Sequence, residues 1–193
     1  MYIPSHFSVP GKETLLQILP EASFATLVST DKDGLPFATH LPFSYDPERG
    51  KNGTLIAHMA RANPHGALLE SGVSLVIFQG PHTYISPSYY ATDINVPTWN
   101  YVAVHLYGQA RIINDPEGIL DILQNLTVEN EAGRPTPWVP EHLDPKRLTA
   151  MMHGIIAFEI PVDRIEGKAK LGQNKTAEDQ AAVREHVGDL FAP

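Results

Sequence analysis

A tight turn between two strand-like segments is the feature that most constrains the fold of this chain. Residues 25–29 and 36–43 carry β-branched and alternating apolar side chains, and the sequence Asp31-Lys32-Asp33-Gly34 lies between them. A glycine in such a turn supplies the positive φ that a hairpin needs, so the two segments are predicted to pair antiparallel. Because an isolated hairpin exposes unpaired edges, further strands must complete the sheet.

Other segments with the composition of strands follow along the chain. They are residues 54–59, 74–79, 101–113 and 155–160. About six antiparallel strands result. The length of segment 101–113 favours a sheet that curls into a small barrel, since closure removes exposed edges. The chain is therefore predicted to be mainly β with short helices, of the α+β class.

Four helices are predicted, and in the last two apolar residues recur at helical spacing after a capping residue. The predicted helices are residues 11–19, 64–71, 116–130 and 176–187, the last two beginning after Asp115 and Thr176. Residues 81–98 and 133–145 are long proline-rich loops, which in compact domains often form lids or subunit contacts. We expect one domain over residues 1–193, with a C-terminal helical segment at about 176–187.

Composition narrows the class of protein. The chain has 193 residues, of which 42% are hydrophobic, and this is enough to build a core. It has no cysteine, which excludes disulfides and thiolate metal sites. No apolar run reaches the roughly 18 residues of a membrane span, and the first residues lack the order of a signal peptide. We therefore expect a soluble cytoplasmic protein that does not enter a membrane.

The charge of the chain bears on nucleic-acid binding. The net charge is −8, and only 14 residues are lysine or arginine. Non-specific affinity for DNA comes mainly from basic side chains that neutralise phosphates. DNA is therefore a candidate partner that the charge does not support.

The segment of residues 55–72 predicts a strand that leads into an anion-binding helix start. Asn63 is a favourable N-cap and Pro64 a favourable first helical residue, so free backbone N–H groups would face an anion there. Arg61 offers a planar charged fork to phosphate oxygens, and His65 beside an anion would hold its proton. A phosphate is the expected ligand. The alternative is an ordinary surface helix with a solvated Arg61.

The histidines do not indicate a metal site or a hydrolase. Five of the nine lie in the strand-rich centre, at His40, His58, His65, His82 and His105. No pair has the spacing of a helical zinc motif, so no metal ligand is predicted. No glycine-flanked serine forms a nucleophile elbow, and no catalytic residue is assigned.

Planar and amide side chains gather in one stretch of the sequence. They are Gln79, His82, Tyr84, Tyr89, Tyr90, Trp99, Asn100, Tyr101 and Tyr107. Such a set suits a flat heteroaromatic ring, because a cofactor pocket needs apolar walls and a few directed polar groups. The alternative interpretation is a core with a dimer seam.

Six groups of residues spread over the chain carry a family resemblance. They are residues 1–4 with Phe7, 40–43, 58–65, 78–82 with 84–87, 96–101, and 170–171 with 173–175. Together they resemble the PaiB-type family of FMN-binding negative transcriptional regulators, and the match runs nearly end to end. The resemblance implies a split β-barrel of the FMN-binding type, similar to pyridoxamine-phosphate oxidase. It also implies a homodimer with FMN at the subunit interface.

The same resemblance implies a set of cofactor-binding residues. They are Thr39, His40, His58, Arg61, Asn63, His65, Gln79, Trp99, Asn100, Lys170, Gln173 and Lys175. In this set the phosphate lies at the 61–65 turn, the strand residues face the flavin, and segments 99–101 and 170–175 come from the other subunit. The chain departs from the family pattern at Gly66 and Gly172, where members often carry tryptophan and serine.

Three functions stay open on the sequence. The resemblance implies repression of transcription, yet no helix-turn-helix with a basic recognition face is present, so the effect could be indirect. The alternative is a flavin-dependent oxidoreductase, or a haem-degrading relative, that acts on a small substrate. A third reading is a dimer that binds a phosphorylated small molecule without turnover.

Overall fold

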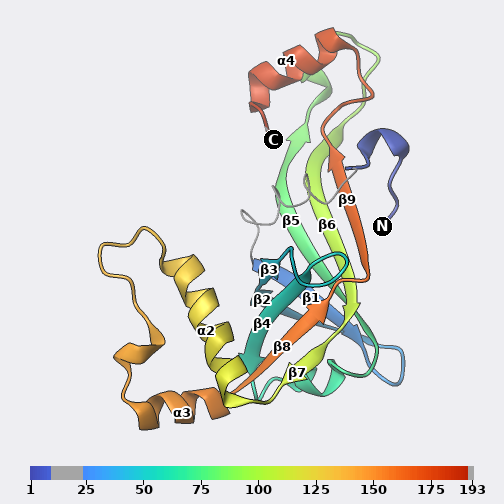
Figure 1. Ribbon diagram of the computed structural model, residues 1–193. Helices are drawn as coiled ribbons and strands as arrows, with labels where there is room; N and C mark the ends of the chain where they lie inside the picture. Colours follow the sequence, from blue (N-terminus) through green and yellow to red (C-terminus); the bar gives the residue numbers. More distant parts are fainter. Residues whose placement is uncertain (10–23, 191–193) are drawn as a thin grey trace. The chain divides into compact units, whose positions relative to one another are not determined.

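Two sheets dominate residues 1–9 and 24–190, which are the part of the chain that the computed structural model describes (Figure 1). Hydrogen bonding gives the orders β2-β1-β5-β6-β9 and β3-β4-β8-β7. The strands are β1 Phe24–Thr30, β2 Pro36–Pro42, β3 Ser44–Asp46, β4 Thr54–Ala60, β5 Val73–Ile85, β6 Thr98–Gln109, β7 Arg111–Ile113, β8 Ile155–Pro161 and β9 Arg164–Lys170. The pairs β1–β2, β3–β4, β4–β8 and β7–β8 are antiparallel, as predicted.

Short helices connect the strands. The 3-10 helices are η1 Ser5–Phe7, η3 Pro64–Leu68, η4 Pro87–Tyr89 and η5 Pro140–His142, and the α-helices are α2 Pro116–Glu131, α3 Pro145–His153 and α4 Ala177–Val187. The predicted caps of α2 and α4 are confirmed, because Asp115 accepts from Gly118 N at 2.7 Å and Thr176 from Asp179 N at 3.1 Å. The predicted helix at 11–19 lies outside the described residues.

The described chain divides into two compact units. Unit 1 comprises residues 1–9, 77–105 and 165–190, and unit 2 comprises residues 24–76 and 106–164. Strands β5 and β6 contribute residues to both units.

The predicted hairpin is present in unit 2. Strands β1 and β2 pair from Phe24 opposite Pro42 to Thr30 opposite Pro36. In the turn, Asp31 Oδ1 accepts hydrogen bonds from the backbone N–H groups of Asp33 and Leu35, at 2.8 and 2.9 Å. Gly34 has a φ of +83°, the conformation that its lack of a side chain permits.

The core of unit 2 follows from the alternation along its strands. On β4, Leu55, Ala57 and Met59 are buried and face the same side. Ala57 pairs with Phe158 of β8, and the ring of Phe158 meets that of Phe43 edge to face at 6.2 Å.

A second apolar layer covers the other face of β4 and β8 (Figure 1). Helix α2 buries Ile119, Ile122 and Leu126 against Ala157 and Ile56. Helix α3 contacts α2 and β8 and completes this layer. Helix α2 thus holds β8 from the side opposite Phe43 and Phe158.

Unit 1 consists of parts of β5 and β6 with β9 and α4. Its buried apolar side chains include Phe78, Ile85, Val102 and Val104 from the first two strands. Helix α4, which Figure 1 labels, contributes Val183 to this core. It also contacts η4 within this unit.

Several boundaries differ from the sequence prediction. The predicted strand 101–113 is broken at Ala110, and helix 64–71 is instead the five-residue 3-10 helix η3. Strands β3 and β9 and helix α3 were not predicted, since β3 has three residues and β9 carries four charged side chains. Strand β5 extends to Ile85, so the first predicted loop is shorter than residues 81–98.

Candidate functional site

The turn between β4 and η3 is built around Asn63. Its side-chain Oδ1 accepts a hydrogen bond from His65 N at 3.0 Å, and its carbonyl accepts from Gly66 N at 3.1 Å. The predicted N-cap role of Asn63 is therefore confirmed. The expected free N–H groups are absent, however, because Pro64 has none and the next two are used within the turn. Anion binding at this helix start stays a prediction, and these two N–H groups are already paired within the turn.

Arg61 precedes this turn and is fixed by backbone carbonyls. Its Nε donates to His153 O at 2.7 Å and its Nη2 to Ile155 O at 2.6 Å, while its own N–H donates to Gly154 O at 2.8 Å. The side chain is exposed, and Nη1 makes no hydrogen bond to any residue that the structure describes. The guanidinium is thus anchored at one edge and open at the other, rather than simply solvated.

His65 is the best-enclosed polar side chain of the predicted site. It has no exposed surface, and its ring lies 5.2 Å from the ring of Phe37, edge to face. Nδ1 lies 2.8 Å from Thr39 Oγ1, and Nε2 lies 2.9 Å from Ser29 Oγ. Burial lowers the pKa of His65, so the ring is neutral. The expectation that it holds a proton beside a bound anion stays a prediction, since no anion is part of this structure.

Two serines complete this network, and neither was predicted as a site residue. Ser29 Oγ lies 2.8 Å from Ser74 Oγ, and both side chains are buried. A signal for Ser29 exists, because it continues the buried positions Ala25 and Leu27 along β1.

The remaining predicted residues of unit 2 lie around this group in different ways. Asn63 Nδ2 donates to Thr39 Oγ1 at 3.3 Å, so Thr39, Asn63 and His65 are brought together. His40 is exposed and stacks on Phe24 with ring centroids 6.4 Å apart. His58 lies on β4 opposite Ala157. Its Nδ1 is buried with no partner among the described residues, and burial lowers its pKa.

The predicted residues of unit 1 form an aromatic and basic group. The ring of Trp99 is half-exposed and lies 5.8 Å from Tyr84 and 6.4 Å from His82. Gln79 Nε2 lies 3.4 Å from His82 Nδ1. Lys170 Nζ donates to Thr98 Oγ1 at 2.5 Å and to Trp99 O at 2.6 Å, which ties β9 to the start of β6.

Lysines concentrate positive charge in this unit. Burial, followed by the charges of Lys168 and Lys175, lowers the pKa of Lys170. Lys175 donates to Asn95 Oδ1 at 2.6 Å and lies 5.3 Å from the centre of the Tyr90 ring. An anion near these lysines would relieve their mutual repulsion.

Gln173 makes contacts that hold the local structure, and Asn100 is buried. Gln173 Oε1 accepts from Leu171 N at 2.8 Å and its Nε2 donates to Ala169 O at 2.7 Å, so it closes the turn after β9. Asn100 is buried and lines a small cavity of about 90 Å³ beside α4.

Both departures from the family pattern have a local reason. A Cβ at Gly66 would overlap Cδ1 of Ile156, so the turn packs directly on β8. Gly172 has a φ of +87°, a conformation that a serine side chain rarely adopts.

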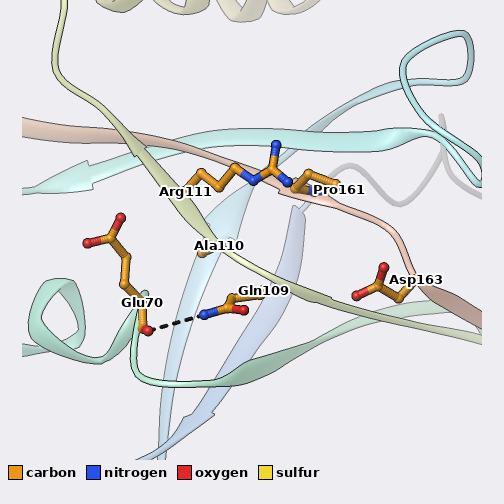
Figure 2. A pocket seen from close by; sticks show the side chains of 6 residues that line it. All are labelled: Glu70, Gln109, Ala110, Arg111, Pro161 and Asp163. Atoms are coloured by element: carbon orange, nitrogen blue, oxygen red, sulfur yellow. Dashed lines mark hydrogen bonds between the residues drawn. The ribbon is translucent and has the colours of Figure 1, made fainter.

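A polar pocket of about 380 Å³ in unit 2 lies away from the predicted residues (Figure 2). Its lining is Glu70, Gln109, Ala110, Arg111, Pro161 and Asp163. Gln109 Nε2 donates to Glu70 O at 3.4 Å, the contact dashed in Figure 2. None of the predicted site residues lines this pocket.

The described residues hold no group of three or more histidine, aspartate or glutamate side chains arranged to bind a metal. Within the same ranges, none of the helices is long and apolar enough to cross a membrane.

The sheet arrangement defines the class of protein. The flavocytochrome Anf3 of Azotobacter vinelandii aligns with a TM-score of 0.69 at 18% identity, over 93% of this chain and 78% of that chain. The FAD and haem binding protein of Mycobacterium smegmatis aligns with a TM-score of 0.65 at 20% identity, over 91% and 78%. The fold is the split β-barrel of the FMN-binding type, which confirms the predicted fold class.

Sequence comparison places the chain more narrowly. The family model described as "Putative FMN-binding domain" matches residues 1–164. "Protease synthase and sporulation protein PAI 2" of Bacillus subtilis is 38% identical over 188 residues, which cover 97% of this chain and 89% of that protein. An uncharacterised protein of Saccharomyces cerevisiae is 36% identical over 157 residues, covering 70% and 93%. The chain belongs to the PaiB-like family of FMN-binding proteins, and the predicted family and cofactor are confirmed.

Proposed function

We propose that this protein binds FMN with its phosphate at Arg61 and Thr39 and acts as a homodimeric regulator of the PaiB-like type. The observation that carries the proposal is the anchored guanidinium of Arg61. Two of its nitrogens are held by carbonyls of His153 and Ile155, so the position of the open edge is set before a ligand arrives. A preset, permanently charged donor suits a phosphate.

The residues present fit the rest of the cofactor. Thr39 is a partly exposed residue, and its hydroxyl lies beside Asn63, the cap residue two positions after Arg61. The family resemblance implies that segments 99–101 and 170–175 come from the other subunit, and there Trp99 with the neighbouring Tyr84 offers aromatic surface of the kind that flavin rings contact, while Lys170 adds a positive charge. Bound FMN supplies the redox chemistry of its isoalloxazine ring, while the chain's own residues bind and orient it.

Exposed apolar side chains support the homodimer. On the β1–β2 hairpin, Phe24 and Leu35 are both 64% exposed and Phe37 is 37% exposed. Six of the seven residues of β2 are not buried, and Leu41 is the exception. A second copy of the chain that covered this hairpin would remove this apolar surface from water.

The regulatory part of the proposal rests on the family. The Bacillus subtilis relative is named for protease synthesis and sporulation. The net charge of −8 argues against regulation through broad contact with DNA phosphates. We propose a cytoplasmic protein whose effect on transcription depends on FMN rather than on non-specific DNA binding.

The test is a titration of flavin-free protein with FMN, in which quenching of the flavin fluorescence reports binding. We expect saturable quenching at roughly micromolar protein, and weaker binding of riboflavin, which lacks the phosphate. Equal affinities for the two flavins would contradict the phosphate site. No quenching by either flavin would contradict FMN binding itself.

A promoter band-shift assay tests the regulatory part. We expect no retardation of random-sequence DNA at physiological salt, with or without FMN. Retardation that falls steeply with salt would show that phosphate contacts dominate, and would contradict this part of the proposal.

A further inference from the structure

We propose that the hydroxyl of Thr39 is an obligate hydrogen-bond donor for a phosphate oxygen, and that the buried chain Ser74–Ser29–His65 fixes this polarity. All the residues involved lie in unit 2. The proposal rests on the proposed FMN site and assigns Ser29, Ser74 and His65 as positioning residues.

The donor and acceptor roles along this series of hydrogen bonds are set at its buried end, Ser74. Ser74 has no exposed surface, and within the described residues its hydroxyl has one hydrogen-bond partner, Ser29 Oγ at 2.8 Å. A buried hydroxyl proton without an acceptor costs free energy, so Ser74 must donate to Ser29.

The next step follows from the first. Ser29 Oγ accepts from Ser74, and its own proton has one other neighbour, Nε2 of His65 at 2.9 Å. Ser29 is buried as well, so it donates to Nε2. Nε2 therefore carries no proton. Burial lowers the pKa of His65, which keeps the ring neutral and leaves its single proton on Nδ1.

Thr39 Oγ1 accepts the hydrogen bond from that N–H group. Nδ1 of His65 lies 2.8 Å from Thr39 Oγ1 and must donate to it.

Asn63 fills the second lone pair of Thr39. Its Oδ1 accepts from the backbone N–H of His65 at 3.0 Å, which fixes the orientation of the amide. Nδ2 of Asn63 therefore faces Thr39 and donates to Oγ1 at 3.3 Å. Both acceptor positions of the hydroxyl are occupied, and its own proton has no acceptor among the described residues.

The consequence is a rule for the ligand. Because Thr39 can only donate, the group that binds it must present an acceptor oxygen, and an amine or amide N–H would be rejected. A phosphate oxygen meets this requirement beside Arg61. His65 thus acts on the ligand through Thr39 rather than by contact.

The first experiment reads the tautomer directly. Long-range proton–nitrogen NMR of flavin-free protein, with His65→Asn used to assign the signal, should show neutral His65 protonated on Nδ1 near neutral pH. A ring protonated on Nε2, or on both nitrogens, would overturn the proposal. This readout does not require that FMN binds.

The second experiment reads the consequence for binding. Thr39→Val should weaken FMN binding roughly tenfold or more, because the hydrogen bond from the hydroxyl to the charged phosphate is lost. It should leave riboflavin affinity unchanged. Thr39→Ser keeps the hydroxyl and should bind both flavins within about twofold of the wild type. An equal loss for FMN and riboflavin in Thr39→Val would overturn the phosphate assignment.

The two experiments separate the two proposals. If the wild type binds neither flavin while His65 shows the Nδ1 tautomer, the proposed FMN site fails and the polarity of Thr39 stands. If FMN binds and His65 is protonated on Nε2, the proposed function stands and the polarity fails.

Discussion

At the scale of single residues, Arg61 contributes both charge and rigidity. Its side chain is exposed, yet two of its nitrogens are bound to backbone carbonyls at 2.7 and 2.6 Å. Arg61→Ala should weaken FMN binding more than tenfold, above about 1.4 kcal/mol, because the phosphate loses a charge-assisted contact. Fluorescence titration measures this change.

The control variants separate charge from geometry. Arg61→Lys keeps the charge and loses the planar fork, so we expect an intermediate affinity. Lys32→Ala removes an exposed lysine that pairs with Asp33 in the hairpin turn, and should leave FMN affinity unchanged. Wild-type affinity in Arg61→Ala would show that the phosphate binds elsewhere.

Buried histidines should make the stability of the protein depend on pH. Burial lowers the pKa of His58 and of His65 below the ordinary value of 6.5. Well above pH 6.5, both histidine rings are neutral in the folded and in the unfolded state. As the pH falls below 6.5, the unfolded chain takes up protons that the folded chain does not, so the free energy of unfolding decreases.

Urea unfolding of flavin-free protein at about pH 7.5 and about pH 5.5 checks this prediction. His58→Leu should reduce the loss of stability at the lower pH, since Nδ1 of His58 has no partner in the described structure. His142→Gln, at an exposed position, should leave the pH dependence as it is. A wild-type stability that rises on acidification would contradict the assignment.

At the scale of elements, α4 holds the loop between β5 and β6 through Asp179. The carboxylate accepts from Thr92 N at 3.0 Å, from Thr92 Oγ1 at 3.1 Å and from Asn95 Nδ2 at 3.1 Å. Burial raises the pKa of Asp179, but hydrogen bonds from Asn95, Thr92 and Thr176 outweigh it, and the pKa is lowered.

Asp179→Asn should therefore loosen this loop, because an amide cannot accept from all of these donors. We expect hydrogen exchange at the Thr92 amide to become roughly tenfold faster or more. Asp189→Asn, which removes an exposed ion pair with Arg184, is the matched control. Unchanged exchange at Thr92 in Asp179→Asn would show that the loop is held by other contacts.

The end of β6 depends on a glycine. A Cβ at Gly108 would overlap the carbonyl oxygen of Pro161 and lie 2.8 Å from Cγ2 of Ile160. Gly108→Ala should destabilise the protein by about 2 kcal/mol, as expected for overpacking. Gly72→Ala is the control, since a Cβ there meets no atom within 4 Å. Urea unfolding compares them, and equal stability of the two variants would contradict the close approach.

The same elements show what could be predicted from the sequence. The hairpin, α2 and α4 were predicted because a turn glycine or a capping side chain marks them locally, as Gly34 and Asp115 do. The close approach of Gly108 to Pro161 joins residues that are distant in the chain, and no local pattern encodes it.

The candidate site shows the same limit. The cap role of Asn63 follows from its sequence position, but the burial of His65 and its contact with Ser29 depend on strands that are distant in the chain. A sequence pattern places residues on faces and does not fix which hydrogen bonds they exchange.

At the scale of the whole molecule, exposed apolar surface is the strongest indication of a partner. On the hairpin, Leu35 and Phe24 are each 64% exposed, and in unit 1 Ile94 and Val96 are 90% and 68% exposed. Burial of such side chains drives association of protein subunits. We therefore expect a mass twice the 21.2 kDa of one chain in solution.

The dimer can be tested by placing a charge on the hairpin. Phe24→Asp should shift the protein toward monomer, since a carboxylate buried in an apolar interface loses hydration without gaining a partner. Val128→Asp, at a position of α2 that is 62% exposed, changes the charge equally and should leave the dimer intact. Light scattering after size-exclusion chromatography gives the mass of each variant. A monomeric wild type, or a Phe24→Asp variant that remains dimeric, would contradict an interface at the hairpin.

If FMN affinity falls together with the dimer in Phe24→Asp and persists in Val128→Asp, the cofactor site requires the second copy, as expected for FMN at a subunit interface.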